Sequence, residues 1–300
     1  MNKLLQLLAR LEVIPRKTIY LVLFIAAGLP FLYPIRLPLM IWKETRSAFN
    51  ITQNSAPNKV VAICSNWDPG SQGENWPQYE AIVAHCMMNH VPFIVFSIDS
   101  DAVSPQLAET VNERQAKRYG CVYGRDWVNL GLTRGAPLVM GSIGRNIKQV
   151  FQTDYRHNST RDFTKLPLME HVYSLNDFSC LWDVEYTPNL DWTAFFDPAS
   201  RVPLLFSCAG MVSSGYYPYI SSGQIKGMMV GTRGAAEYEN LLNEKYGKAF
   251  KSEGMRGQKL VVPLAFGHLV IIFFILAGNV GMIARRKLIA NERAAKKGQL

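Results

Sequence analysis

The chain has 300 residues, of which 48% are hydrophobic, and a formal net charge of +9 at pH 7. The positive excess lies outside the middle of the chain, since residues 43–259 hold 21 basic and 21 acidic side chains. A nucleic-acid-binding domain carries its positive charge on the folded part, so this distribution argues against nucleic acid as a partner. It is instead typical of a membrane protein with basic flanks.

Two long apolar segments bracket the chain. Residues 18–42 contain no charged side chain before Arg36, and residues 260–284 contain none at all. About 20 apolar residues form a helix long enough to cross a bilayer, so the sequence predicts two transmembrane helices in contact with membrane lipid. The first segment lacks the short apolar region and cleavage site of a signal peptide, which favours an uncleaved anchor. Prolines within it (Pro30, Pro34 and Pro38) indicate a helix that kinks or ends early.

The charged ends of the chain orient it. Residues 1–17 hold four basic side chains and one acidic one, and residues 285–300 hold six basic side chains and one acidic one. Because basic flanks stay on the cytoplasmic side, we expect both termini in the cytoplasm and the middle of the chain outside it, in a periplasm or lumen. The leucines of residues 1–17 share one helical face, which predicts a tail lying in the membrane interface. Residues 285–300 predict a basic cytoplasmic tail.

Strand and helix patterns alternate after a polar, turn-rich stem over residues 43–58. Apolar runs predict strands and helical spacing predicts helices, in this order: strand 59–64, helix 77–89, strand 92–98, helix 104–119, a strand beginning at 121–123, strand 137–140, helix 143–151, strand 201–207, strand 225–230 and helix 235–246. The continuous apolar strands are typical of a sheet covered on both faces. The sequence therefore predicts an α/β domain over 59–259, with a Rossmann-like or flavodoxin-like, mostly parallel sheet, between two transmembrane helices.

An acidic, aromatic segment over residues 152–200 interrupts this pattern. We interpret it as an insertion that either docks a partner protein or folds down as a second cover of the sheet. In the first case its aromatic side chains are the natural anchors, because aromatic residues dominate binding energy at interfaces. The candidate partner-binding residues are Trp182, Tyr186, Trp192, Phe195 and Phe196.

Acidic residues follow the predicted strands. Asp68, Asp99 and Asp126 lie just beyond three of them, with Arg125 beside the last. Ligands of open α/β sheets bind at the carboxyl ends of the strands, so these residues are candidates for a carboxylate cluster that holds a hydrated cation or acts in acid–base catalysis. The alternative is that they only cap turns and helices.

Motifs for bound cofactors and metals do not occur in the sequence. The glycines near residue 70 have neither the phosphate-loop spacing nor the dinucleotide-binding spacing, so we predict no cofactor. The five cysteines form no Cys-x-x-Cys pair or zinc pattern, and we predict no metal site.

Three functions are compatible with this sequence. The first is a non-catalytic subunit or scaffold of a larger membrane assembly, built from other subunits or from copies of this chain, in which the extracytoplasmic domain makes protein contacts. The second is an extracytoplasmic ligand-binding sensor. The third is a membrane-anchored hydrolase or transferase that uses the strand-end carboxylates.

Overall fold

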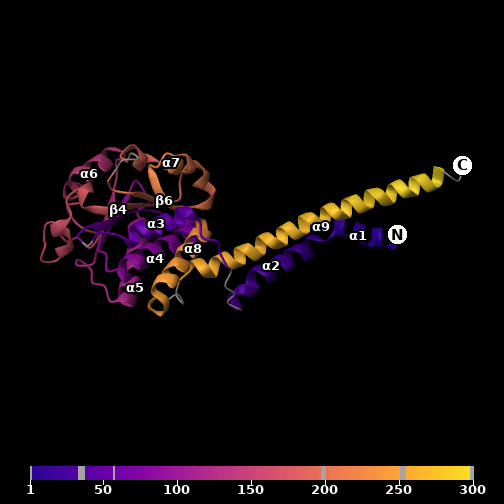
Figure 1. Cartoon of the computed structure of the whole chain (residues 1–300), viewed down its shortest axis with the longest axis horizontal. Helices are drawn as coiled ribbons and strands as arrows, with labels where there is room; N and C mark the ends of the chain where they lie inside the picture. Colours follow the sequence, from indigo (N-terminus) through magenta and orange to yellow (C-terminus); the bar gives the residue numbers. More distant parts are fainter. Residues whose placement is uncertain (1, 33–37, 57, 197–200, 251–254, 298–300) are drawn as a thin grey trace. The chain divides into compact units, whose positions relative to one another are not determined.

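The chain forms two units in the computed structural model, which describes residues 2–32, 38–56, 58–196, 201–250 and 255–297. One unit contains Met1–Leu37 and Lys259–Leu300, and the other is Pro38–Gln258 (Figure 1). The second unit is the α/β domain.

Six parallel strands form one sheet in the domain. The strands are β1 (Val60–Asn66), β2 (Phe93–Ile98), β3 (Trp127–Thr133), β4 (Phe178–Glu185), β5 (Leu204–Cys208) and β6 (Ile225–Val230). Their order is β3-β2-β1-β4-β5-β6, and each neighbouring pair is parallel. This order is the doubly wound, Rossmann-like one, which confirms the predicted α/β class and the parallel sheet.

Helices cover both faces of the sheet (Figure 1). One face packs under α3 (Lys43–Gln53), α4 (Gln72–Met88), α5 (Ser104–Tyr119) and α8 (Gly231–Tyr246). The other face packs under α6 (Leu138–Val150), α7 (Tyr217–Ser221) and the short 3-10 helices of residues 167–194 and 210–215. The strands alternate between two apolar cores, with Val61 and Ile63 in the first and Ala62 and Cys64 in the second. This double burial explains the continuous apolar runs of the sequence.

The segment expected to be a stem over 43–58 contains helix α3 instead. Its buried side, which includes Ala48 and Phe49, packs on β6 and α8. The Ser47 hydroxyl donates to the carbonyl of Lys226 at 2.6 Å, and the Trp182 indole donates to the Thr52 hydroxyl at 3.0 Å. The polar composition of this segment reflects only the exposed face of an amphipathic helix.

Three other elements differ from the sequence prediction. The third strand is β3, which begins after residues 121–123, and the proline-led run at 137–140 begins helix α6 instead of forming a strand. The largest difference is β4, which lies inside the segment expected to be an insertion at 152–200. Because β4 pairs with both β1 and β5, that segment contains a central strand of the sheet.

The first unit contains helices α1 (Asn2–Ala9), η1 (Arg10–Val13), α2 (Arg16–Leu32) and most of α9 (Gly257–Lys297). Among the described residues, one helix by itself is long and apolar enough to cross a membrane, over Gly257–Asn291. The expected helix over 18–42 is wrong in its extent, because α2 has 17 residues and passes the same test only with the helix before it, at a bend of 78°. Seventeen residues of helix span roughly 25 Å, which is less than the thickness of a bilayer core. Pro34 and Arg36 lie outside the described residues.

Close contacts join the helices within this unit. A side chain at Gly281 would collide with the backbone of Leu11 and Glu12, and Glu12 pairs with Arg285 at 3.3 Å. Helix α9 is continuous through residues 285–297, so the segment predicted as a basic tail is helical where the structure describes it.

Replacing Gly227 with alanine tests the docking of α3. A Cβ atom at Gly227 would lie 2.7 Å from the Cα atom of Ala48, so alanine must push α3 away from β6. Overpacking of this kind costs about 1–3 kcal/mol, and we expect G227A to lower the free energy of unfolding of the full chain by that amount in denaturant titrations.

Gly73 provides the matched control. It lies in α4, where an added Cβ would meet no atom within 4 Å. The G73A change is expected to leave stability unchanged or to raise it by up to about 1 kcal/mol. Equal stability of G227A and the wild type would show that α3 does not pack on β6.

Candidate functional site

The carboxyl ends of β1 and β4 form the topological switch point of the sheet, because the strand order reverses between them. Ligands of doubly wound proteins bind at this position. Asn66 ends β1 and Glu185 ends β4, and the two residues are register partners. Both side chains are buried, so the chain places an amide and a carboxylate where the fold usually holds its ligand.

Glu185 is a well-satisfied carboxylate. Its Oε1 accepts hydrogen bonds from the backbone amides of Tyr186 and Thr187 at 2.9 and 3.0 Å and from the Thr187 hydroxyl at 2.8 Å. Its Oε2 accepts from the Asn66 amide at 3.3 Å. Burial raises the pKa of Glu185, and these hydrogen bonds oppose the rise. Glu185 is therefore the member of the local acid pair that retains its negative charge.

Asp183 is the second acid of this pair, two residues earlier on the same face of β4. It is 1% exposed, and its Oδ1 has no hydrogen-bond partner among the described residues. Burial raises the pKa of Asp183 well above its usual range, the charge of Glu185 raises it further, and a hydrogen bond with Cys64 lowers it. Burial likewise raises the pKa of the Cys64 thiol. Protonation is therefore favoured more strongly at Asp183 than at Glu185.

A second buried network connects the ends of β5 and β6 to helix α4. The Gln78 amide nitrogen donates to the carbonyls of Cys208 and Gly231 at 2.9 and 3.0 Å, while its oxygen accepts from Ser207 at 2.8 Å and Asn75 at 3.1 Å. These bonds use the full donor and acceptor capacity of the Gln78 side chain. The network fixes α4 against the strand ends.

Aromatic side chains occupy the space around the switch point. Trp67, Trp192 and Tyr216 are at most 2% exposed, and the Tyr216 hydroxyl donates to the carbonyl of Thr187 at 3.0 Å. Buried aromatic side chains of this chain thus lie beside the position that holds a cofactor in many doubly wound proteins.

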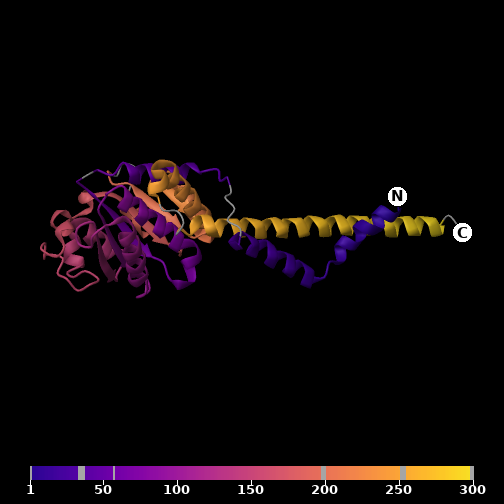
Figure 2. The same ribbon diagram turned by 90° about the horizontal axis from the view of Figure 1, so that it is seen from below.

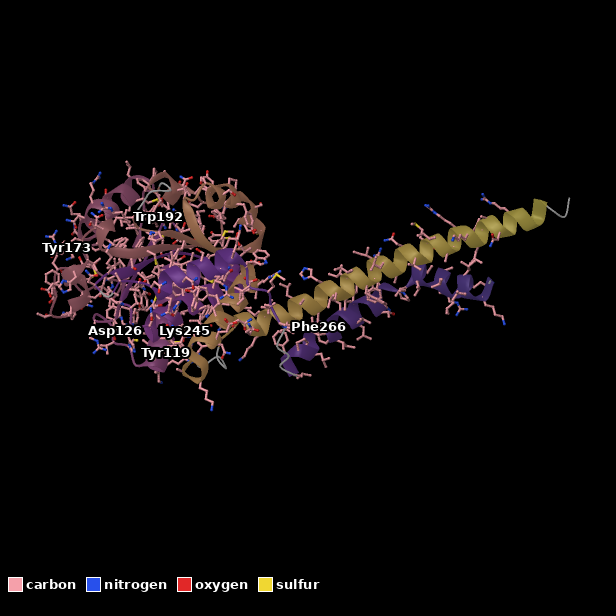
Figure 3. All side chains as sticks on the ribbon, viewed as in Figure 1. Tyr119, Asp126, Tyr173, Trp192, Lys245 and Phe266 are labelled. Atoms are coloured by element: carbon pink, nitrogen blue, oxygen red, sulfur yellow. The ribbon has the colours of Figure 1, made fainter. Side chains whose placement is uncertain are left out.

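The predicted carboxylate cluster does not form. Asp68 and Asp99 do follow β1 and β2, but Asp126 immediately precedes β3 and so lies at the opposite edge of the sheet. Figure 3 shows Asp126 on the side of the domain away from Trp192. The error came from placing the third strand before Asp126.

Each predicted acid has a local structural role. Asp68 accepts from the Ser71 backbone amide at 2.8 Å and caps a short 3-10 helix. Asp99 accepts from the amides of Gly135 and Ala136 at 2.8 and 2.7 Å. Asp126 pairs with Arg125 at 2.8 Å, and a hydrogen bond from Arg125 lowers the pKa of Asp126. Each of the three carboxylates therefore has a hydrogen-bond or ion-pair partner within the domain.

The aromatic candidates are divided between core and surface. Trp182, Trp192 and Phe196 are buried, which removes them from any accessible docking surface. Tyr186 is half-buried and Phe195 is 39% exposed. Side chains alternate between the two faces of β4, which places Trp182 in the core. Because β4 was not predicted from the sequence, this burial was not expected.

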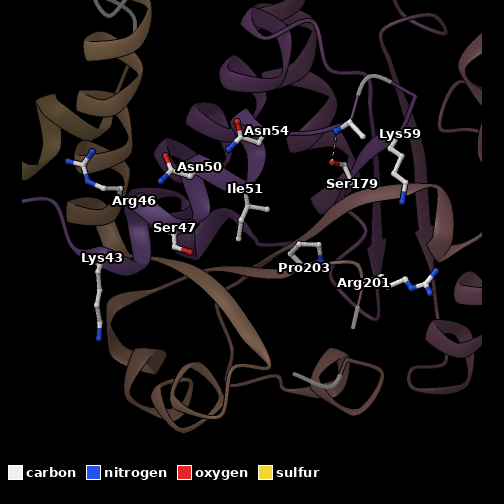
Figure 4. A pocket seen from close by; sticks show the side chains of 11 residues that line it. Lys43, Arg46, Ser47, Asn50, Ile51, Asn54, Lys59, Ser179, Arg201 and Pro203 are labelled. Carbon is white, nitrogen blue, oxygen red and sulfur yellow. Dashed lines mark hydrogen bonds between the residues drawn. The ribbon is translucent and has the colours of Figure 1, made fainter. Parts of the chain in front are cut away.

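A basic groove lies at the amino edge of the sheet, between α3 and the starts of β1, β4 and β5 (Figure 4). Its volume is about 670 Å³. Its lining includes four cationic side chains, those of Lys43, Arg46, Lys59 and Arg201. In the described part of the chain, no group of three or more His, Cys, Asp or Glu residues is arranged to hold a metal ion.

Comparison with known proteins adds no assignment. No protein-family model matches the chain, and neither a curated protein nor a solved structure matches it significantly.

The acid pair predicts a specific pH dependence of stability. An unfolded aspartic acid has a pKa of about 3.9, so the folded state binds more protons than the unfolded state between that pH and the raised pKa of Asp183. Stability is therefore lost as the pH rises through this window, by up to about 1.4 kcal/mol per pH unit. The D183N change keeps the shape of the side chain and removes its titration, so we expect D183N to be less sensitive to rising pH than the wild type.

Thermal unfolding of the full chain at several pH values between 5 and 8 measures this difference. D101N is the matched control, because Asp101 is exposed in the loop after β2; this variant should follow the wild-type profile. Parallel profiles for D183N and the wild type would refute the raised pKa of Asp183.

Proposed function

We propose that this protein is a membrane-anchored, non-catalytic subunit whose α/β domain docks a partner protein through the carboxyl edge of its sheet. In this proposal both termini are cytoplasmic and the domain is extracytoplasmic. The observation that carries the proposal is a set of exposed apolar side chains on the loops at the carboxyl edge of the sheet.

Leu138 and Met211 are the most exposed of these side chains. Leu138 begins α6 after β3 and is 83% exposed, and Met211 follows β5 and is 86% exposed. Phe195 follows β4, and its ring packs against α6 at Gly141, one helical turn beyond Leu138. Single exposed apolar residues are common, but the carboxyl ends of parallel strands bring these three to one edge, and such gatherings mark interaction surfaces.

Acidic side chains border this apolar edge. Asp68, Asp101 and Asp191 lie on the loops after β1, β2 and β4, with Arg134 on the loop after β3. The complementary partner surface has an apolar centre and more basic than acidic residues around it.

Helix α9 supports the membrane anchor, since its Gly257–Asn291 portion is long and apolar enough to cross a bilayer. The start of α9 is held by the domain, because the backbone amides of Gly257 and Gln258 donate to the Glu239 carboxylate at 2.7 and 2.8 Å. Gly257 and Gln258 belong to the domain unit, and these hydrogen bonds fix them against α8.

Placing carboxylates in the apolar edge tests the docking surface. We expect the double change L138E/M211E to weaken partner binding by at least about tenfold, because buried, unpaired charges are costly at the centre of an interface. The protein is extracted from its native membrane in mild detergent, separated by size-exclusion chromatography and examined by mass spectrometry for stoichiometric partners, including further copies of itself.

The V122E variant is the control. Val122 is 49% exposed but lies before β3, at the opposite edge. Partner recovery should be normal with V122E and lost with L138E/M211E. A wild-type protein that elutes as a bare monomer, or a double variant that retains its partner, would contradict the proposed function.

A further inference from the structure

The described residues that line the basic groove carry a positive charge that none of them compensates. Eleven described residues line it, and none of these is acidic. Arg46, Lys59 and Arg201 form no ion pair within the described residues, and Lys43 lies only within 3.8 Å of the neighbouring Glu44 while its side chain is 91% exposed. Elsewhere in the domain, Arg114, Arg125, Arg156 and Arg233 each pair with a carboxylate.

The cations approach the groove from three segments of the chain. Figure 4 shows Lys43 and Arg46 on helix α3 at one end and Lys59 and Arg201 on the segments leading into β1 and β5 at the other. The first two are held in place by the docking of α3 on β6, so they do not depend on a flexible loop for their positions. An ordered arrangement of like charges around one cavity is stabilised when an anion binds there.

Neutral donors accompany the cations. The Ser179 hydroxyl oxygen accepts from the Ala56 amide at 3.3 Å, which leaves its hydrogen available to donate. The exposed amides of Asn50 and Asn54 also line the groove. Arginine forks, lysine ammonium groups and such donors are the groups that bind phosphate oxygens in proteins.

We propose that this groove binds the phosphate group of an anionic phospholipid headgroup. Lys59 and Arg201, together with the Ser179 hydroxyl, contact the phosphate, and Ile51 and Pro203, which also line the groove, contact its glycerol portion. The groove is open and, at about 670 Å³, has room for an esterified phosphate and its substituents.

The sequence position of the groove favours a lipid over a free phosphate. Lys43 and Arg46 follow Leu32, the last described residue of the apolar helix α2, by 11 and 14 residues. Long lysine and arginine side chains near the end of a membrane segment reach the headgroup region on either side of a bilayer. The inference rests on the membrane anchoring in the proposed function but not on the partner-docking edge.

Native mass spectrometry of the full chain in non-ionic detergent tests the proposal. The wild type is titrated with phosphatidylglycerol and, separately, with phosphatidylcholine. We expect one phosphatidylglycerol molecule to bind with preference over phosphatidylcholine. In the variant K59Q/R201Q this affinity should fall by at least about tenfold, since hydrogen bonds to charged groups are among the stronger ones.

The control variant K117Q/R161Q removes one lysine and one arginine that are exposed outside the groove, and it should retain wild-type lipid binding. The R201K variant keeps the positive charge but loses the planar guanidinium group. It should bind phosphatidylglycerol more tightly than K59Q/R201Q does. Thermal unfolding checks that each variant is folded; should K59Q/R201Q fail to fold, the comparison is made with K59Q alone.

Three results would overturn the proposal. The first is wild-type protein that binds phosphatidylglycerol no more tightly than phosphatidylcholine. The second is an equal loss of lipid affinity in K59Q/R201Q and K117Q/R161Q. The third is displacement of the bound lipid by millimolar inorganic phosphate, which would assign the groove to a free anion. Partner recovery by K59Q/R201Q and lipid binding by L138E/M211E are measured alongside. Each should be normal, so a failure of the lipid inference is distinguishable from a failure of the docking proposal.

Discussion

The pairing of β1 with β4 is the constraint on which the remaining structure depends. These strands are far apart in the sequence, and their parallel register brings Asn66 opposite Glu185. The Asn66 side chain then joins three strands, because its oxygen accepts from the Ile98 amide at 2.9 Å and its nitrogen donates to Glu185. An acidic residue at a sheet centre is costly unless its oxygens are satisfied. Glu185 meets this condition through four hydrogen bonds. Asp183 Oδ1 has no hydrogen-bond partner among the described residues, and burial raises the pKa of this carboxyl instead.

Helix α3 makes the chain before β1 part of the domain. The Phe49 ring stacks on His85 with centroids 4.5 Å apart, and His85 contacts the Tyr238 hydroxyl at 2.7 Å. Burial lowers the pKa of His85 to about 3, so it remains neutral at physiological pH. Gly227 permits this packing by leaving space for the backbone of Ala48. Because α3 forms one wall of the basic groove, the groove exists only while these contacts hold.

Strands of uniformly apolar composition could be predicted from the sequence. Strands that contain polar side chains hydrogen-bonded inside the domain could not. β1, β2, β5 and β6 were each located to within a few residues. β4 was missed because Asp183 and Glu185 give its segment an acidic composition that suggests a surface, although both are buried. β3 was misplaced because Asn129 and Gly131 interrupt its apolar pattern. The Asn129 amide in fact donates to Glu109 at 2.9 Å and to the Pro105 carbonyl at 3.0 Å.

These two errors determined what could be predicted of the candidate site. Without β4, the switch point could not be located, and with β3 placed too early, Asp126 was assigned to the wrong edge of the sheet. Local pattern identifies buried apolar strands well, but it does not show that a polar side chain is satisfied by a strand distant in the sequence. Local sequence pattern could not predict the basic groove either, because its four cations come from three separate segments of the chain.

The charge balance of residues 43–259 conceals a separation of charge across the sheet. Lys43, Arg46, Lys59 and Arg201 line the amino edge, whereas Asp68, Asp101 and Asp191 lie on loops at the carboxyl edge. All six strands run in the same direction, so these edges are opposite sides of one rigid body. A domain with no net charge can therefore present surfaces of opposite sign to an anionic headgroup and to a partner with basic residues. The parallel sheet keeps the two proposed sites apart, and binding at one does not occupy the other.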